Sequence, residues 1–215
     1  MKAYREYRRA ARASLAGHWT GSALVCLIAI AIIAACGAPS IIATAVPGME
    51  NISNESVIAG SVAQLLIGIP MSLAILIAFL RLIRGHHHML HNLLRSFNRN
   101  WFRLMAAGFM SRLVMGLTGI FTLGILGVYF ALAYAMVPYL IEDYPSLSWV
   151  EAMRTSRQMM DGHKWELLWL TLSFIGWILL AIVTCGIGLL WVYPYMNTTF
   201  AHYYEDLKKE TIVED

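Results

Sequence analysis

Four long stretches of this chain contain no Asp, Glu, Lys or Arg, and they restrict its fold more than any other feature. They are Ala13–Met49, Ser56–Leu80, Leu113–Ile141 and Leu167–Tyr204, of 37, 25, 29 and 38 residues. About 20 helical residues cross a bilayer core of about 30 Å, so each stretch is long enough for one span or more. Only 13% of residues are charged, against about 25% in a soluble domain, which is too few to cover a soluble surface. We therefore predict a helical membrane protein and exclude a soluble enzyme, a nucleic-acid reader and a disordered chain.

Glycine and proline positions divide the apolar stretches into six predicted spans. Gly37 and Pro39 end the first span, and Pro70 lies inside the second. Residues 104–141 are too long for one span and have Gly124 and Gly127 near their middle, which predicts a hairpin of two spans. The first four spans run from about 20 to the high thirties and over 57–80, 104–121 and 128–141. The fifth and sixth lie within 167–204, on either side of 184–186. The predicted fold class is all-α, a polytopic bundle of about six transmembrane helices.

The distribution of basic residues favours six spans and places both termini in the cytoplasm. With six spans, the cytoplasmic segments 1–19, 81–103, 142–164 and 205–215 carry five, five, three and two Lys or Arg residues, and the external loops carry none. If 104–141 were a single span, ten Lys and Arg residues would lie on the cytoplasmic side and five on the external side. Cytoplasmic loops carry the excess of Lys and Arg, so the six-span reading fits better. Trp19, Trp101, Trp165 and Trp169 then all lie at the cytoplasmic boundary, as an aromatic belt requires.

We expect a single integral membrane domain over 1–215, with a basic amphipathic lead-in at 1–19, a bundle at 20–204 and a cytoplasmic tail at 205–215. The lead-in has five basic residues against one acid, Glu6, and Tyr4, Ala11 and Leu15 recur at near-helical spacing. This pattern predicts a helix that lies on an anionic membrane surface. We expect the first span to be retained rather than cleaved near Cys36.

The chain has no motif of a standard enzyme or nucleotide-driven machine. Every Asp and Glu lies outside the apolar cores of the predicted spans, whereas proton-coupled carriers usually keep a carboxylate within the membrane. There is no HExxH, GxSxG, P-loop or dinucleotide fingerprint, and the three cysteines form no CxxC pair. We predict no catalytic residue and no cofactor.

A cluster of histidines, His86, His87, His88 and His91, follows the second predicted span. On a helix, His87 and His91 share a face four residues apart, which suits a transition-metal pair. No carboxylate or cysteine in this segment completes such a site, and Arg84, Arg95 and Arg99 surround it. We therefore predict a polar cytoplasmic loop whose charge changes with pH, and no metal site.

Four basic residues are candidates for contact with a lipid or a substrate: Arg112, Arg154, Arg157 and Lys164. Arg112 lies inside the third predicted span, where it either binds an anionic group or extends its side chain to the cytoplasmic headgroups. The other three belong to 145–164, which looks like a helix on the membrane, with a Ser148–Glu151 capping box and a stop at Gly162. Two arrangements are open for Arg154 and Arg157. In the first, they bind anionic lipids. In the second, they pair with Glu142, Asp143 or Glu151 inside the bundle.

Several motifs in the second half of the chain resemble those of a known family. They are Ala133-Tyr134-Ala135-Met136-Val137-Pro138-Tyr139, Glu142-Asp143-Tyr144-Pro145, Met160-Asp161-Gly162-His163-Lys164-Trp165, Leu172-Ser173-Phe174-Ile175-Gly176-Trp177 and Gly186-Ile187-Gly188-Leu189-Leu190-Trp191. Over about 133–204 the chain resembles the integral membrane family called domain of unknown function 975. The resemblance implies a polytopic bacterial membrane protein of the cytoplasmic (inner) membrane, with no assigned activity.

Two classes of function fit these features. In the first, the protein is a non-enzymatic membrane accessory or scaffold that organises lipids, expected to be anionic, or partner proteins through its basic cytoplasmic face, with no nucleic-acid partner. In the second, it carries a small or lipid-like solute through a site between helices kinked at Pro70, Pro138 and Pro194. A polar cavity near Arg112, Pro138 and Pro194 would favour the carrier, and a closed interior would favour the scaffold.

Overall fold

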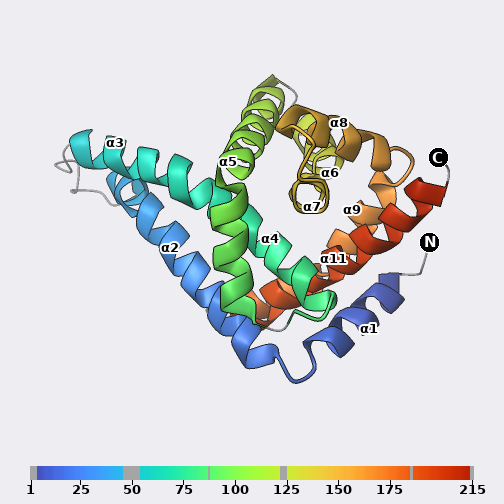
Figure 1. Ribbon diagram of the computed structural model, residues 1–215. Coiled ribbons are helices and arrows are strands. Elements are labelled where there is room, and N and C mark those ends of the chain that lie inside the picture. The colour runs from blue at the N-terminus through green and yellow to red at the C-terminus, as the bar shows by residue number, and fades with distance from the viewer. Residues whose placement is uncertain (1–3, 46–53, 87, 122–124, 185, 214–215) are drawn as a thin grey trace.

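The computed structural model describes residues 4–45, 54–86, 88–121, 125–184 and 186–213, and the described residues form helices with no strand. In Figure 1 the α2–α3 hairpin extends to one side of the central α4–α5 pair, and α6 to α11 gather with α1 on the other side. The elements are α1 (Tyr4–Leu15), α2 (Trp19–Ala45), α3 (Asn54–Ala63), a π-helical turn (Gln64–Gly68), α4 (Ile69–Ile83), α5 (Met89–Phe121), α6 (Ile125–Ala133), α7 (Val137–Asp143), α8 (Trp149–Met159), α9 (Lys164–Leu172), α10 (Ile175–Val183) and α11 (Leu189–Val213).

Within the described residues, three helical segments are long and apolar enough to cross a membrane: Trp19–Ala38, Glu55–Ile83 and Lys164–Val183. They correspond to the first, second and fifth predicted spans, and the count of six stays a prediction. The fourth predicted span is not one continuous helix. Its segment is divided into the nine residues of α6, a turn at Tyr134–Met136, and α7 with Pro138 near its start. The sixth coincides with part of α11, which carries Asn197, Thr198 and Thr199 among its apolar residues.

Helix α2 does not end where the sequence predicted. The sequence predicted a break at Gly37 and Pro39, but the helix continues to Ala45. A proline removes one backbone hydrogen bond and crowds the preceding turn, and a long apolar helix tolerates this loss when the rest of its backbone remains bonded.

The second predicted span is bent around Pro70 rather than interrupted by it. A π-helical turn precedes α4, with the Ile69 N–H bonded to the Gln64 carbonyl, and Pro70 lies in the first turn of α4. Pro70 has no N–H to donate to the preceding turn. The carbonyl of Leu66, four residues earlier, instead accepts the indole N–H of Trp101 from α5 at 2.8 Å. Trp101 therefore satisfies a backbone carbonyl of the neighbouring helical segment, a role that the predicted aromatic belt did not include.

Helix α1 is amphipathic as predicted, but its apolar face lies against the protein. Tyr7, Ala11 and Leu15 are buried, and Tyr7 packs edge-on against Tyr203 of α11 with ring centroids 5.6 Å apart. The α1 hydroxyl of Ser14 also lies 2.9 Å from a ring nitrogen of His202 of α11. The apolar face of α1 is therefore covered by α11, and the position of this helix on an anionic membrane surface stays a prediction. The outward face of α1 is basic.

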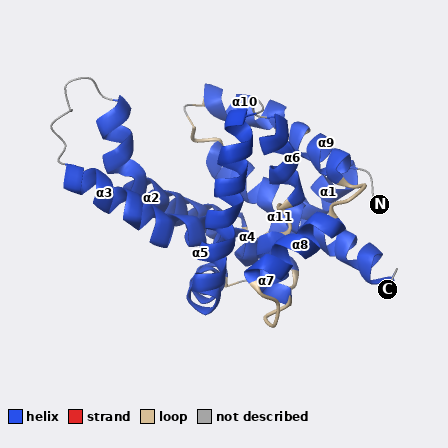
Figure 2. Ribbon diagram, turned by 90° about the horizontal axis from the view of Figure 1, so that it is seen from above, coloured by secondary structure: helices blue, strands red, loops and turns tan. Residues whose placement is uncertain are grey.

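The most buried part of the molecule lies where α4, α7 and α11 meet. Phe79 of α4, Tyr139 of α7 and Tyr204 of α11 are fully buried, and the rings of Tyr139 and Tyr204 stack with centroids 4.9 Å apart. In Figure 2, seen from above, α4 and α11 lie between the α2–α3 hairpin and the outer helices. Residues 205–213, the described part of the predicted tail, continue α11, and Glu205 and Lys208 lie at the edge of this core.

Candidate functional site

A cluster of paired charges joins the ends of α4 and α7 to α5 and α11. We call it the ionic cluster, and its members are Arg81, Arg84, Asn100, Glu142, Asp143, Tyr204, Glu205 and Lys208. At its centre the Arg81 guanidinium donates from Nε and Nη2 to Oε1 of Glu142, with a 2.9 Å bond from Nε. Asn100 donates to the other carboxylate oxygen at 2.9 Å. The side chains of Arg81 and Glu142 are 9% and 10% exposed, so this is a buried ion pair.

Asp143 is the second acid of the ionic cluster and has three donors. Arg84 binds both of its oxygens, with a 2.8 Å bond from Nη2, and Lys208 and Tyr204 donate to Oδ2 at 2.6 and 2.9 Å. Burial alone would raise the pKa of Asp143, but the hydrogen bonds from Arg84, Lys208 and Tyr204 outweigh it and lower the pKa below its ordinary value. Hydrogen bonding to Asp143, with a further bond to Glu205, raises the pKa of Arg84 despite its partial burial.

The turn between α7 and α8 is fixed by Arg103 of α5. One guanidinium nitrogen donates to the carbonyl of Tyr144 at 3.1 Å and to the carbonyl of Leu147. Carbonyls at a helix end have no partner within the helix, and a cation is favourable there. Burial, with a smaller contribution from Arg99, lowers the pKa of Arg103. Arg103 and the ionic cluster together hold the start of α8 in one position.

Helix α8 has the cap and the stop predicted for it. The hydroxyl of Ser148 accepts the Glu151 N–H at 3.2 Å, the Ser148 N–H donates to the Glu151 carboxylate at 2.7 Å, and Gly162 has a φ of 79°. The capping bonds from Ser148 lower the pKa of Glu151. The inward side holds Ala152, Met153, Ser156 and Met159, and the hydroxyl of Ser156 donates to the Ala133 carbonyl of α6 at 2.8 Å.

Arg154 and Arg157 lie on the exposed side of α8. Glu142 and Asp143, the two acids considered as their partners, are bound by Arg81, Arg84 and Lys208 instead. Glu151, the third acid considered, interacts with Arg154 through their charges alone. Arg81, Arg84 and Lys208 therefore bind the two acids that were considered as partners of Arg154 and Arg157, and Arg154 and Arg157 lie on the surface.

Lys164 begins α9 and lies beside an apolar pocket of about 550 Å³. Its ammonium is 2.9 Å from Asp161 Oδ1 and 5.0 Å from the ring centroid of Tyr129 of α6. Asp161 itself is exposed. The walls of the pocket are mostly apolar, formed by Val128, Leu132, Trp165 and Leu168. A cation at the mouth of an apolar pocket matches an amphiphile with an anionic head.

Arg112, the remaining candidate, is exposed on α5, and its guanidinium donates to the hydroxyl of Ser72 of α4 at 3.2 Å. Its contact is with α4, whereas Arg154, Arg157 and Lys164 belong to α8 and α9. We use the name basic surface for Arg154, Arg157 and Lys164 alone.

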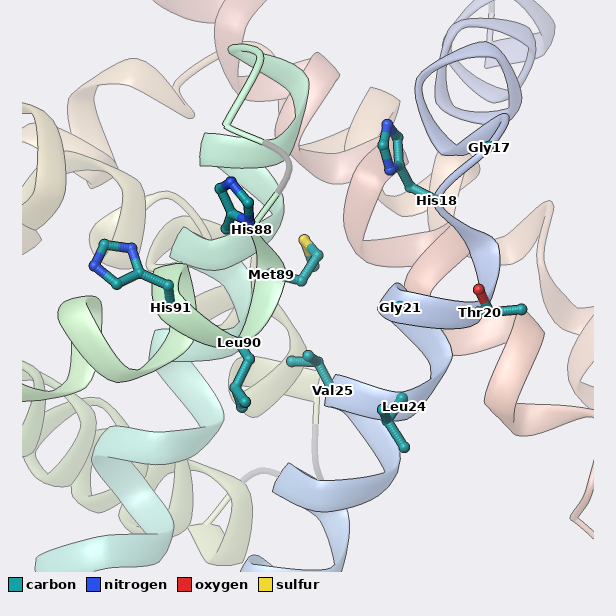
Figure 3. A pocket seen from close by; sticks show the side chains of 10 residues that line it. All are labelled: Gly17, His18, Thr20, Gly21, Leu24, Val25, His88, Met89, Leu90 and His91. Carbon is teal, nitrogen blue, oxygen red and sulfur yellow. The ribbon is translucent and has the colours of Figure 1, made fainter.

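The histidine cluster does not form a metal centre in the part of the chain that the structure describes. Among those residues, no group of three or more His, Cys, Asp or Glu side chains is placed to hold a metal ion. His87, one member of the predicted helical pair, lies outside the described residues. His88 directly precedes α5 and His91 lies in its first turn, and with His18 they line an open pocket, shown in Figure 3.

The sequence analysis missed the residues that organise this region: Arg81, Arg84, Asn100 and Arg103. One signal was present. Arg81 and Arg84 follow an apolar run directly, at a spacing that places both near one helix end, and Glu142 and Asp143 do the same after Ile141. Two helix ends of opposite charge are expected to meet if their helices are neighbours, but the sequence did not identify α4 and α7 as neighbours.

These observations define an all-helical protein with helices able to cross a membrane and with a basic surface beside an internal ionic cluster. Residues 118–211 match the family described as protein of unknown function (DUF975), which confirms the family resemblance over this part of the chain. The match includes α7, α8, α9 and α10, and with them the whole basic surface. No curated protein and no solved structure matches the chain.

Proposed function

We propose that this is a non-enzymatic accessory or scaffold protein of the bacterial inner membrane, multi-pass with both termini cytoplasmic, that binds anionic phospholipids through the basic surface. The observation that carries the proposal is the contrast in pairing among the basic residues. Arg81, Arg84 and Lys208 are bound to internal acids, while Arg154 and Arg157 extend from an otherwise inward-packed helix. A basic residue near an anionic leaflet contributes about 1 kcal/mol to association.

The aromatic residues next to the basic surface support a position at the membrane boundary. Trp165 and Trp169, in the first turns of α9, are 71% and 65% exposed. They begin the candidate span Lys164–Val183. Tryptophan is enriched at the headgroup level of membranes because its ring is amphipathic. In this position the two indoles contact the headgroup region while Arg154 and Arg157 face the lipid phosphates.

The ion pair of Lys164 leaves it able to bind a phosphate. The Lys164 side chain is only 15% exposed, but that of its partner Asp161 is 84% exposed, so solvent screens the pair and its contribution to stability is about 0–1 kcal/mol. A lipid phosphate can therefore replace the Asp161 carboxylate at little cost. The pocket between Tyr129 and Trp165 then accepts the first part of an acyl chain.

The contacts of the prolines favour the scaffold over the carrier. The Leu66 carbonyl beside Pro70 is bonded to Trp101, and the Tyr134 carbonyl, four residues before Pro138, accepts the Val137 N–H at 3.2 Å. Carbonyls satisfied by the protein do not call for a solute. A pocket of about 290 Å³ lies next to Pro194, lined by Trp191, Val192 and Tyr195 among others, and its walls are mostly apolar.

The experiment that tests the proposal is flotation of the full chain with vesicles. Arg154→Gln, Arg157→Gln and Lys164→Gln in one variant are expected to weaken association with phosphatidylglycerol vesicles about a hundredfold, at about fivefold per charge, and to leave phosphatidylcholine association unchanged. A control that also loses three positive charges, Arg5→Gln, Arg9→Gln and Lys209→Gln, changes exposed side chains of α1 and α11. An equal loss in the control would mean that binding follows net charge, and would reject the basic surface as the site.

A further inference from the structure

The pocket of about 290 Å³ next to Pro194 lies where the start of α2 meets α10 and the start of α11. Four of its ten lining residues are aromatic: Trp19, Trp177, Trp191 and Tyr195. The ring of Tyr195 is buried, and its centroid lies 6.5 Å from that of Trp19 and 6.3 Å from that of Trp177. None of the lining residues is Asp or Glu. The pocket is therefore an aromatic site that adds no negative charge of its own.

Thr184, which also lines the pocket, has its hydroxyl bonded within the turn between α10 and α11. The hydroxyl donates to the Ala181 carbonyl at 2.9 Å and accepts the Gly188 N–H at 3.0 Å. Gly188 also lets the two helices approach closely, since a Cβ on it would lie 2.9 Å from the Ala181 Cα. An apolar cavity of about 150 Å³ accepts benzene and stays free of water. A pocket about twice as large, with its hydroxyl already bonded, suits a segment of hydrocarbon chain.

The segments that form the pocket indicate where this hydrocarbon comes from. Trp19 begins one candidate membrane span, and Trp177 and Leu180 belong to another. Leu180 and Trp191, at 56% and 51% exposure, leave the pocket open toward the outside of the protein. A pocket between two spans faces the hydrocarbon core of the bilayer, so the chain available to it is a lipid acyl chain.

Helix α1 brings positive charge to the pocket. Arg12 is exposed and is one of the lining residues. Arg8, one helical turn earlier on the same side of α1, donates from Nη1 to the carbonyl of Ser173, between α9 and α10, at 3.3 Å. The Nε of Arg8 is buried and has no hydrogen-bond partner among the described residues. Aromatic walls alone also suit a quaternary ammonium ion, but two guanidinium groups repel a cation and attract an anion.

We propose that this pocket binds an anionic phospholipid, with Arg12 at the headgroup phosphate and the four aromatic rings around the first part of an acyl chain. Arg8 holds α1 beside the break between α9 and α10 and adds to the positive charge there. A lipid in this position contacts α1, α2, α10 and α11 together. The choice of a membrane lipid rests on the proposed function, but the site shares no residue with the basic surface.

Two matched pairs of variants of the full chain test the two ends of the site. Arg12→Gln removes the charge at the pocket, and Arg9→Gln removes another exposed charge of α1 outside it. Leu180→Ser places a polar group in the apolar wall. Leu179→Ser is its control, because Leu179 is the preceding residue of α10, is 57% exposed and does not line the pocket. Arg12→Lys keeps the charge and should keep most of the affinity.

The measurement is quenching of tryptophan fluorescence by phosphatidylglycerol brominated on its acyl chains, added to the chain in neutral detergent. All variants are made in the background that lacks the basic surface, so the remaining binding reports the pocket. Bromine quenches the indoles that the acyl chain touches. Trp191→Phe should therefore remove emission that the lipid quenches, whereas Trp165→Phe, at the other pocket, should remove emission that it does not quench in this background.

We expect Arg12→Gln to weaken binding about fivefold, the value of one basic residue near an anionic headgroup. Leu180→Ser should weaken it about fourfold or more, the value of one buried methylene group. Arg9→Gln and Leu179→Ser should leave the affinity unchanged. Phosphatidylcholine with the same brominated chains should quench less than phosphatidylglycerol, because its headgroup carries no net negative charge.

The outcomes separate this site from the basic surface and from other occupants. If quenching survives both Arg12→Gln and Leu180→Ser, the pocket proposal is wrong, while the flotation result for the basic surface stands. If removing the basic surface leaves flotation unchanged but quenching of Trp191 still depends on Arg12, the basic surface fails and the pocket is supported. Equal quenching by phosphatidylcholine would overturn the choice of an anionic lipid. If Leu180→Ser separates an oligomer, measured by light scattering, without changing the quenching, a second copy of the chain occupies the pocket and the proposal is wrong.

Discussion

The ionic cluster and the basic surface use the same residue types in opposite ways. In the ionic cluster, Arg81 and Glu142 are almost completely buried and each has a defined partner. On the basic surface, Arg154 and Arg157 lie in solvent on the outer side of a helix whose inner side is packed. The two regions are joined through Asp143, which is bound in the ionic cluster and ends the helix before the turn to α8.

The difference shows that the position of an arginine, rather than its charge, decides what it does. A buried ion carries a desolvation cost of several kcal/mol, so its partner is required for folding. An exposed arginine keeps its water and costs the fold little, so its charge remains available to a second molecule. The ionic cluster should therefore control stability, and the basic surface should control lipid association.

The strongest test is to remove one partner of the buried pair. Arg81→Met leaves Glu142 buried with Asn100 as its hydrogen-bond donor, and it should lower the free energy of unfolding by about 3–5 kcal/mol. Thermal unfolding in neutral detergent measures the loss. Arg81→Met with Glu142→Gln removes both charges and should recover a large part of it. A loss below about 1 kcal/mol for the single change would show that the ionic cluster does not support the fold.

Acidification tests the second acid of the ionic cluster. Because folding lowers the pKa of Asp143, its contribution is complete above the ordinary aspartate pKa of about 3.9 and is lost as the pH falls through the folded value. Asp143→Asn should cost about 1–3 kcal/mol at neutral pH, since charged hydrogen bonds to Arg84 and Lys208 are lost. The variant should then lose less stability than the natural chain between pH 5 and 2. Parallel pH curves for the two chains would contradict this role.

A hydrogen bond between uncharged groups should contribute less to stability than the ionic cluster does. Trp101→Phe keeps an aromatic ring on α5 but removes the N–H that satisfies the Leu66 carbonyl near Pro70. The expected loss is about 1 kcal/mol in the free energy of unfolding, the value of one hydrogen bond. Trp165→Phe, at an indole that is 71% exposed, is the matched control and should change stability less in detergent. Equal losses would mean that the Trp101 bond is not specific.

Local patterns in the sequence predicted helix α8. They could not predict contacts between residues that lie far apart in the chain. The capping box needs only Ser148 and Glu151, three residues apart, and the stop needs only Gly162. The Arg81–Glu142 pair joins positions 61 residues apart, so it depends on α4 and α7 being neighbours. The amphipathic pattern of α1 was also correct, but a pattern does not say whether membrane or protein covers the apolar face.

Reversing the charge on the basic surface should have the smallest effect on stability. It tests whether this surface controls lipid association without supporting the fold. Arg154→Glu with Arg157→Glu changes two exposed side chains of α8 while the inward residues keep their packing. Surface substitutions usually change stability by no more than about 0.5 kcal/mol, so thermal unfolding in neutral detergent should be almost unchanged. Association with phosphatidylglycerol vesicles should fall strongly, because attraction to the anionic surface becomes repulsion. A large loss of thermal stability with unchanged lipid association would place these arginines in an internal clamp. It would also remove the functional distinction between the two regions.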